Sequence, residues 1–326
     1  MTQLRGATAM KSRAFCITLL SIFAVSIAAS LPAQAQRARV FVSVTGNDAN
    51  PCTAGSPCKT FQAAHDAVLA GGEISVLDTG GYGTLVINKA VSIVAVGVEA
   101  SIAIPSGVNG ITINAGATDK VSLRGLTLDG TGVGQTGIAF NSGFSLTVEN
   151  CVVRNMTADG MLYLSTATSS QTLAVSNSYF DGNGGSGIFI KLSNTGGITA
   201  AIDRTGMNGN TGDGLQIQAV SGSTAALTVA MTDSVAANNS FAGVLLDNTG
   251  ALGVINMSLT HSLVSGNGVG LFGEGSGAAF WLAQSTLTGN PTGFNLQTNS
   301  VINSFGDNYF AENGKSTGMF IPVGKQ

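Results

Sequence analysis

Charged residues are scarce in this chain: of its 326 residues, 14 are Lys or Arg and 17 are Asp or Glu. So few basic side chains offer little to a nucleic-acid backbone, which excludes nucleic acid as the expected partner. The 45 glycines show no three-residue period, which excludes a collagen, and the 44% of hydrophobic residues exclude a disordered protein. Such a glycine content favours one long repeat array over two globular domains.

Residues 1–35 have the pattern of an export signal. Three basic residues precede an uncharged apolar run at 14–30, and Ala33 and Ala35 then match the small-x-small pattern that a signal peptidase cleaves. The alternative is an uncleaved membrane anchor, but the run is short for a membrane span and the cleavage pattern follows at once. The sequence therefore predicts a cleaved signal peptide. Its basic residues are Arg5, Lys11 and Arg13.

Cleavage after Ala35 leaves 11 basic and 17 acidic residues, a net charge of −6. A mildly acidic protein is not expected to bind an anionic membrane surface, so we expect no membrane partner after cleavage. The predicted location is outside the cytoplasm: secreted, periplasmic or on the cell surface.

Cysteine usage agrees with export. Cys52 and Cys58 bracket a tight loop that contains proline and glycine, and in an oxidising compartment we expect them to form a disulfide. A metal site is the alternative, but no His or further Cys lies near this loop to complete the ligand set. We therefore expect neither a metal nor another cofactor.

The chain beyond residue 72 is dominated by a repeat. Glycine followed by apolar-x-apolar recurs ten times from Gly83 to Gly318, at intervals of 23 to 29 residues. We call each copy a marker repeat and its first residue the marker glycine. Ahead of most copies lies an alternating stretch that ends in Asn, such as SLTVENCVVRN or TLAVSNSYFDGN. In these stretches apolar residues recur at every second position, with Gly and Asn at the corners, and this period excludes helical repeats. Leucine-rich repeats are excluded because their Leu-x-x-Leu-x-Leu frame is absent. The sequence predicts an all-β parallel β-helix of about ten coils over 73–326.

Stacking of the coils assigns side chains to the inside or the outside. One position of the Asn-ended stretch is apolar throughout and is expected to form a core column. Two positions earlier stands a column of small residues whose hydroxyls can bond along the stack, and it includes Cys151, which we expect to be a core thiol and not a nucleophile. The core column is Leu128, Val153, Phe180, Met207, Ala236, Val264 and Leu287; the small-residue column is Leu126, Cys151, Ser178, Thr205, Ser234, Ser262 and Ser285.

Residues 36–72 form the N-terminal segment, with the cysteine loop and a helix over 60–70 that is expected to cap the open first coil. Thr60 is the expected N-cap, and Gly71-Gly72 the expected end. The helical face predicted to be buried comprises Phe61, Ala64, His65, Val68 and Leu69. On that face, His65 is expected to be a packing residue and not a ligand.

Together these segments resemble the secreted bacterial right-handed β-helix repeat proteins of the pectin-lyase-like superfamily. The resemblance covers roughly residues 40–323 and is carried by VSVTGNDANPCTAGSPCKTFQAAHDAV, by GGEISVLDTGGYGTLVINKAVSIVAVG, and by the stacked Gly-apolar-x-apolar coils. It implies a right-handed solenoid. It does not imply one activity, because that superfamily mixes polysaccharide lyases, hydrolases, epimerases, tailspikes and adhesins.

Catalytic motifs of the superfamily are missing. The Asn-Thr-Asp, Asp-Asp, Gly-His-Gly and Arg-Ile-Lys motifs of polygalacturonase-like enzymes are absent, and no carboxylate cluster suggests a calcium site. One outward polar column remains, in which Arg204, Asp233 and His261 lie on successive coils. Such a column can bind a sugar or move a proton, but alternating charges are also expected wherever coils stack. The full column is Gly125, Asn150, Asn177, Arg204, Asp233, His261, Gln284 and Asp307.

Three further residues are candidates for ligand binding: Tyr179 and Asp203 beside this column, and the single tryptophan, Trp281, on another outward position. Asp159 and Asp213, two coils apart before the marker glycines, have a spacing of about 9.6 Å, near that of an inverting glycosidase pair. Asp before Gly is also ordinary turn chemistry, which is the alternative that we favour.

The marker repeats also carry an outward apolar stripe, which either binds a partner or is covered within the molecule. The stripe comprises Leu162, Phe189, Leu245 and Phe272, with Gln216 and Asn295 between them and Phe320 at its expected end.

The sequence favours a non-catalytic module that binds extracellular or cell-surface polysaccharide, or a protein partner on the stripe. The alternative is a polysaccharide lyase or glycoside hydrolase that uses the column of Arg204, Asp233 and His261. A purely structural surface component is a third possibility. Whether the chain is an enzyme stays open at this level.

Overall fold

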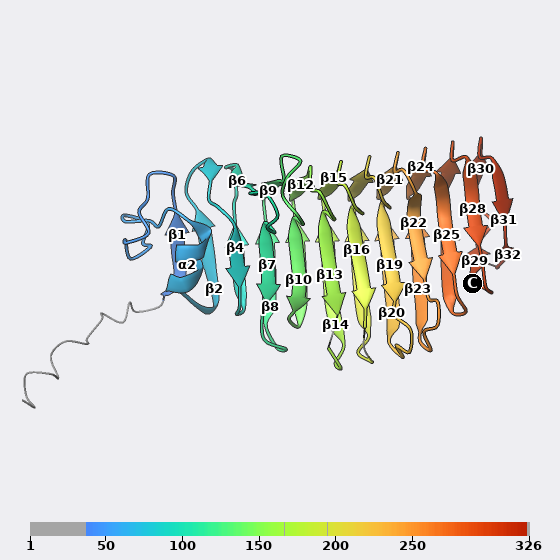
Figure 1. Ribbon diagram of the computed structural model, residues 1–326, viewed down its shortest axis with the longest axis horizontal. Coiled ribbons are helices and arrows are strands. Elements are labelled where there is room, and N and C mark those ends of the chain that lie inside the picture. Colours follow the sequence, from blue (N-terminus) through green and yellow to red (C-terminus); the bar gives the residue numbers. More distant parts are fainter. Residues whose placement is uncertain (1–36, 166, 194, 325–326) are drawn as a thin grey trace, which may run out of the picture. The chain divides into compact units, whose positions relative to one another are not determined.

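The computed structural model describes residues 37–165, 167–193 and 195–324, so the predicted signal peptide lies outside the described part. These described residues form one compact unit. Three parallel sheets run side by side along it, and the chain visits each sheet once per coil (Figure 1). The predicted parallel β-helix of about ten coils is confirmed.

Sheet 1 has twelve strands. They are β1 (Arg37–Val42), β2 (Val68–Val76), β5 (Val91–Val94), β8 (Lys120–Arg124), β11 (Ser145–Glu149), β14 (Gln171–Ser176), β17 (Ile198–Asp203), β20 (Ala226–Thr232), β23 (Val254–Thr260), β26 (Ala278–Ala283), β29 (Val301–Ser304) and β32 (Met319–Pro322).

Sheets 2 and 3 have ten strands each. Sheet 2 comprises β3 (Gly80–Gly81), β6 (Ala100–Ala103), β9 (Leu126–Asp129), β12 (Val152–Arg154), β15 (Tyr179–Asp181), β18 (Gly206–Asn208), β21 (Val235–Ala237), β24 (Leu263–Ser265), β27 (Thr286–Thr288) and β30 (Tyr309–Ala311). Sheet 3 comprises β4 (Leu85–Ile87), β7 (Ile111–Asn114), β10 (Ile138–Ser142), β13 (Met161–Ser165), β16 (Ile188–Leu192), β19 (Leu215–Ala219), β22 (Ala242–Asp247), β25 (Val269–Glu274), β28 (Thr292–Leu296) and β31 (Lys315–Thr317).

The Asn-ended stretch is two strands and not one. In SLTVENCVVRN the chain leaves sheet 1 after Glu149, turns at Asn150 with φ of 53°, and enters sheet 2 at Val152. The same corner in five later coils has φ between 44° and 51°. Asn, Asp and His adopt this left-handed backbone more often than most residues, whereas it is uncommon for Arg. The later corner residues are Asn177, Arg204, Asp233, His261 and Gln284.

Both predicted inward columns are buried. Along the small-residue column each serine hydroxyl accepts a backbone N–H from the preceding coil: Ser178 Oγ accepts from Cys151 at 3.1 Å, and Ser262 Oγ from Ser234 at 3.2 Å. Burial raises the pKa of the Cys151 thiol to about 11, which fits an inert core residue.

A buried asparagine ladder fills the corner between sheets 2 and 3. From Asn210 onward, each amide oxygen accepts both the backbone N–H and the side-chain N–H of the asparagine one coil earlier: Asn239 Oδ1 lies 3.0 Å from Asn210 N and 2.9 Å from Asn210 Nδ2. The repeat showed that Asn recurs here but not that it is buried. The ladder consists of Asn183, Asn210, Asn239, Asn267, Asn290 and Asn313.

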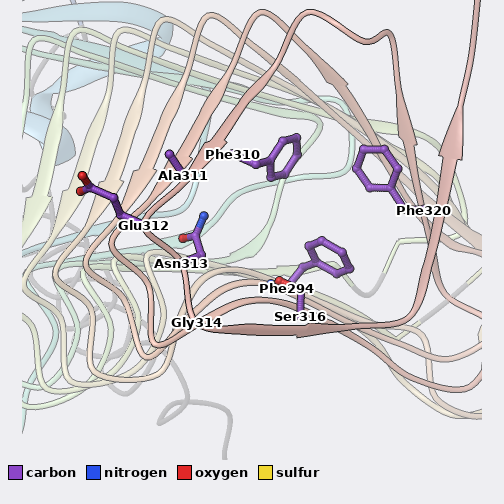
Figure 2. Close-up of a pocket in the computed structure, with 8 residues that line it drawn as sticks. All are labelled: Phe294, Phe310, Ala311, Glu312, Asn313, Gly314, Ser316 and Phe320. Atoms are coloured by element: carbon purple, nitrogen blue, oxygen red, sulfur yellow. Dashed lines mark hydrogen bonds between the residues drawn. The ribbon is translucent and has the colours of Figure 1, made fainter.

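The tenth marker repeat does not lie in sheet 3. Phe320 belongs to β32, which pairs with β29 of sheet 1, and it packs near Phe294 and Phe310 (Figure 2). In sheet 3 the corresponding strand is β31, where Thr317 pairs with Asn295. Placing Phe320 in the outward stripe was therefore wrong, because the corner at Gly318 had already returned the chain to sheet 1.

The predicted capping helix is shorter than expected. Helix α2 (Phe61–Ala67) begins after Thr60, whose side chain accepts the Ala63 N–H, and it ends where Val68 opens strand β2. Leu69 is exposed, contrary to the prediction, because it lies in that strand. Strand β2 also contains Gly71-Gly72 and runs across the boundary expected at residue 72.

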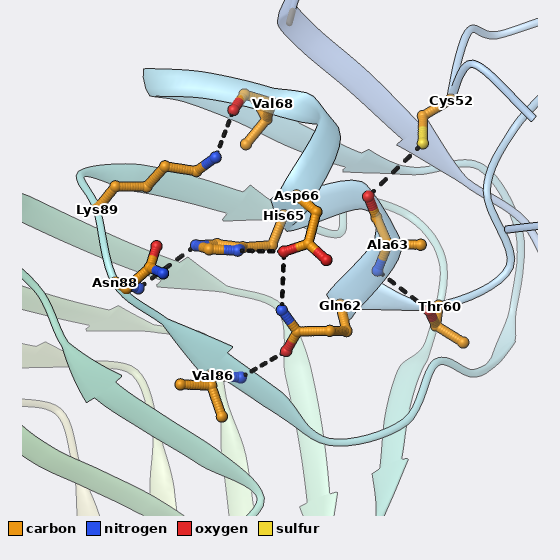
Figure 3. Close-up of polar contacts among 10 residues, drawn as sticks. All are labelled: Cys52, Thr60, Gln62, Ala63, His65, Asp66, Val68, Val86, Asn88 and Lys89. Carbon is orange, nitrogen blue, oxygen red and sulfur yellow. Dashed lines mark hydrogen bonds and ion pairs between the residues drawn. The ribbon is translucent and has the colours of Figure 1, made fainter. Parts of the chain in front are cut away.

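Side chains of α2 cover the outer edge of sheet 3 (Figure 3). Gln62 Oε1 accepts the Val86 N–H of β4 at 2.9 Å, and His65 Nε2 accepts the Asn88 N–H at 3.4 Å. On the outer edge of β1, Phe41 exchanges backbone hydrogen bonds with Cys52 and Cys58. The predicted disulfide joins these two cysteines, with Cα atoms 4.6 Å apart. The N-terminal segment thus satisfies edges that would otherwise be open.

Candidate functional site

A shallow cavity of about 300 Å³ opens on the outer face of sheet 2. Tyr179, Gly206 and Val235 are successive residues of one outward column, on β15, β18 and β21. A Cβ at Gly206 would lie 2.7 Å from Tyr179 Cδ1, so only glycine leaves room for the ring in its present position. The ring is 52% exposed and forms one wall of the cavity. The other residues that line the cavity are Arg204, Thr205, Asn208 and Asp233.

Arg204 is held in place by two neighbours. Its Nε donates to Asn177 Oδ1 at 2.8 Å, and its terminal Nη2 lies 2.6 Å from Asp203 Oδ2. The ion pair is partly solvent-exposed, so it contributes little to stability, about 0–1 kcal/mol. It does fix the direction of the guanidinium beside the cavity.

Asp233 and His261 are less closely coupled than the sequence column suggested. His261 Nδ1 lies 4.0 Å from Asp233 Oδ1, and both side chains are about half exposed. That distance exceeds hydrogen-bond reach, about 2.6–3.2 Å, so the two groups do not form a base dyad in this structure. The structure thus brings Tyr179, Arg204 and Asp233 to one cavity, and His261 is not among the residues that line it.

The charge alternation expected from stacking is present elsewhere. Arg124 lies 3.5 Å from Glu149, and Arg154 Nε lies 2.9 Å from Asp129 Oδ2, each pair joining adjacent coils. Alternation in the column of Arg204, Asp233 and His261 therefore needs no catalytic explanation.

Asp159 and Asp213 both accept hydrogen bonds from backbone N–H groups. Asp159 Oδ1 accepts the Ser186 N–H at 2.8 Å, and Asp213 Oδ1 accepts the Ala242 N–H at 2.9 Å, each one coil further on. Burial raises the pKa of Asp213 to about 6, with a smaller contribution from the charge of Asp159, and burial also raises the pKa of Asp159. Because Asp213 is only 4% exposed, this arrangement fits a structural role better than a glycosidase pair.

Trp281 is separate from the sheet 2 cavity. It is 37% exposed on sheet 1, pairs with Ser258 as expected, and lines a hollow of about 540 Å³ with Phe305, Val323 and Gly324. Sequence reasoning grouped it with Tyr179 as a ligand candidate, but the two lie on different sheets.

The apolar stripe on sheet 3 has the predicted register but little exposure. Leu162, Phe189 and Phe272 are half-buried, and Leu245 is 8% exposed. The ring of Phe241 lies 5.6 Å from that of Phe272 and covers part of it. Among the described residues, the stripe is therefore partly buried, and Phe241 contacts its last member, Phe272.

His65 packs as predicted. It is 1% exposed and burial lowers its pKa, with its Nδ1 3.3 Å from Asp66 Oδ1 (Figure 3). Within residues 37–324, apart from positions 166 and 194, no three His, Cys, Asp or Glu side chains are arranged to hold a metal ion. The same residues contain no helix of the length and hydrophobicity that a membrane span requires.

Residues 109–290, more than half of the chain, match the right-handed β-helix region family, and the chain belongs to that family. Its fold is similar to those of pectate lyase Pel9A (15% identity over 87% of this chain and 78% of that chain, TM-score 0.57) and rhamnogalacturonan lyase (13%, 86% and 84%, TM-score 0.52). ORF18 of Geobacillus virus E2 is also similar (15%, 99% and 65%, TM-score 0.59). Curated proteins give no significant match. At these identities the likeness concerns the fold alone.

Proposed function

We propose that this protein is a secreted, non-catalytic module that binds neutral polysaccharide at the sheet 2 cavity. The observation that carries the proposal is the open cavity in which the Tyr179 ring stands beside Arg204, Asn208 and Asp233. An aromatic face packs against the apolar side of a sugar ring, and nearby polar groups bond to its hydroxyls.

Local charge favours a neutral sugar. Arg204 is paired with Asp203, which leaves Asp233 at the cavity. Asp181 stands next to the cavity residue Asn208, whose backbone and side-chain N–H groups it accepts. The surrounding potential is therefore negative on balance, and a uronate chain would be repelled.

Export supports the extracellular part of the proposal. The pattern of residues 1–35 predicts a signal peptide, and the Cys52–Cys58 disulfide is consistent with an oxidising compartment.

The enzymatic alternative, a lyase or hydrolase, has the names of Pel9A and rhamnogalacturonan lyase in its favour. Against it stand the 4.0 Å separation of Asp233 from His261 and the burial of Asp213. Asp233→Asn separates the two functions, since a general acid or base contributes about 10²–10⁴-fold in rate. Polysaccharide cleavage that this near-isosteric change abolishes in a folded protein would support the enzyme.

Binding of the purified protein to a panel of neutral and acidic polysaccharides is measured by affinity electrophoresis and calorimetry. Tyr179→Ala is expected to weaken binding of a neutral glycan about 2- to 10-fold, the equivalent of a ring contact of about 0.5–1.5 kcal/mol. Trp281→Ala, an exposed aromatic on sheet 1, is the matched control and should leave the affinity unchanged. Loss of binding in Trp281→Ala but not in Tyr179→Ala would move the site to sheet 1.

A further inference from the structure

Two aromatic residues at core positions of the last coil face solvent. Phe310 continues the inward column of sheet 2 after Leu287, and Phe320 continues that of sheet 1 after Ile302. Leu287 and Ile302 are fully buried, whereas Phe310 is 37% and Phe320 is 40% exposed. Their exposure follows from position, because no coil in the described part of the chain lies beyond them.

These rings border a hollow at this end of the solenoid. Phe294, Phe310 and Phe320 surround a volume of about 450 Å³ with Glu312 and Asn313 (Figure 2). The Phe310 and Phe320 rings meet edge to face with centroids 5.6 Å apart. Exposed aromatic rings that gather around a hollow at the solvent boundary are a candidate interaction surface.

Strands β30, β31 and β32 are the last of the three sheets, so their outer backbone edges face this same end. Such edges readily pair with another strand. At the opposite end α2 and the cysteine loop satisfy edge groups of β4 and β1. Among the described residues the two ends are therefore unlike: one is covered and the other is open.

We propose that the open end is the interface of a two-fold symmetric dimer, with a second copy of this chain as the occupant. Head-to-tail stacking would require the covered end to accept a strand, so the open end pairs with its own kind in an isologous contact. A two-fold axis parallel to the plane of the last coil and just beyond it, over the corner between β30 and β31, sets β32 antiparallel to β32 of the second copy. The same axis sets β30 against β31 of the second copy, and antiparallel edges form a regular ladder.

Charge at that corner fits the same symmetry. Glu312 and Lys315 are both exposed and flank Asn313-Gly314. The axis places Glu312 opposite Lys315 of the second copy and repeats that contact on the other side. Both contacts join opposite charges, which sets the register of the two coils.

The first test is sedimentation of the chain from residue 36 onward across a concentration series. The wild type is expected to shift from monomer to dimer without larger species, and Phe320→Asp to remain monomeric. Phe241→Asp alters an exposed aromatic just before β22 of sheet 3 and should dimerise like the wild type. Wild-type protein that stays monomeric up to its solubility limit, or that forms open-ended filaments, would overturn the proposal.

A charge exchange tests the symmetry itself. Glu312→Lys alone and Lys315→Glu alone place like charges opposite each other at both contacts and should weaken dimerisation about tenfold. An equal mixture of the two variants restores opposite charges at both contacts and should recover wild-type affinity as a heterodimer. Since neither variant alters a buried residue, failure of the mixture to recover would refute this interface even if the wild type dimerises.

Discussion

Asp213 holds a carboxylate in a nearly solvent-free position and uses it to accept the backbone N–H of Ala242 in the next coil. The marker repeat revealed that Asp precedes Gly here, and turn chemistry predicted a structural role. Neither could show that burial raises the pKa of Asp213, because burial depends on the coils stacked on both sides. The same holds for Gly206, whose missing side chain makes room for Tyr179.

This burial predicts how stability depends on pH. The folded pKa of Asp213, about 6, exceeds the unfolded value of about 3.9. The stabilisation of the folded state by this carboxyl group is therefore fully present below about pH 4 and is lost as pH rises through 6. Asp213→Asn keeps an oxygen acceptor but does not titrate. Relative to the wild type, it should gain about 1–3 kcal/mol of unfolding free energy between pH 4 and pH 7.5. Urea denaturation at several pH values measures this difference, and a difference that stays constant with pH would contradict it.

At the scale of elements, the sequence predicted the repeat, the inward columns, the disulfide and the N-cap of the helix. It missed the corner at Asn150. The alternation of inward and outward residues continues unchanged across this single left-handed residue, so the two strands look like one in the sequence. It also missed the asparagine ladder, since exposed turns favour Asn as strongly as buried ones do. The end of α2 was misplaced because Val68 and Leu69 fit both a helical face and a strand.

The ladder makes a sharp prediction about two adjacent asparagines. Asn239 is buried and bonded to Asn210, Met207 and Asn267, so Asn239→Leu leaves several buried polar groups without partners. We expect a loss of about 2–4 kcal/mol in unfolding free energy, at about 1–3 kcal/mol for each unsatisfied group. Asn238 is exposed with φ of 57°, so Asn238→Gly should change stability by less than about 0.5 kcal/mol. Equal effects of the two changes in thermal or urea unfolding would argue against the ladder.

At the scale of the whole solenoid, each coil contacts only its neighbours, so stability is close to a sum of coil and interface contributions. In the part of the chain that the structure describes, a central coil is bound on both faces, the first coil is covered by α2 and the cysteine loop, and the last coil is bound on one face only. Because the coil that carries Phe310 and Phe320 has a neighbour on one face only, it is expected to unfold locally more easily than the other coils. The end that offers strands to a second copy is therefore also the least stable end.

Hydrogen exchange should therefore follow position along the solenoid. In dilute solution, where the chain is monomeric, amides of β30–β32 are expected to exchange fastest and those of β14–β23 slowest. His65→Ala removes the acceptor of the Asn88 N–H and should speed exchange in α2 and β4 without affecting β30–β32. Raising the protein concentration should slow exchange in β30–β32 alone, because pairing with a second copy covers only those edges. Uniform protection from β4 to β32 would mean that the solenoid unfolds as one unit, and the unlike ends would then have no consequence for its stability.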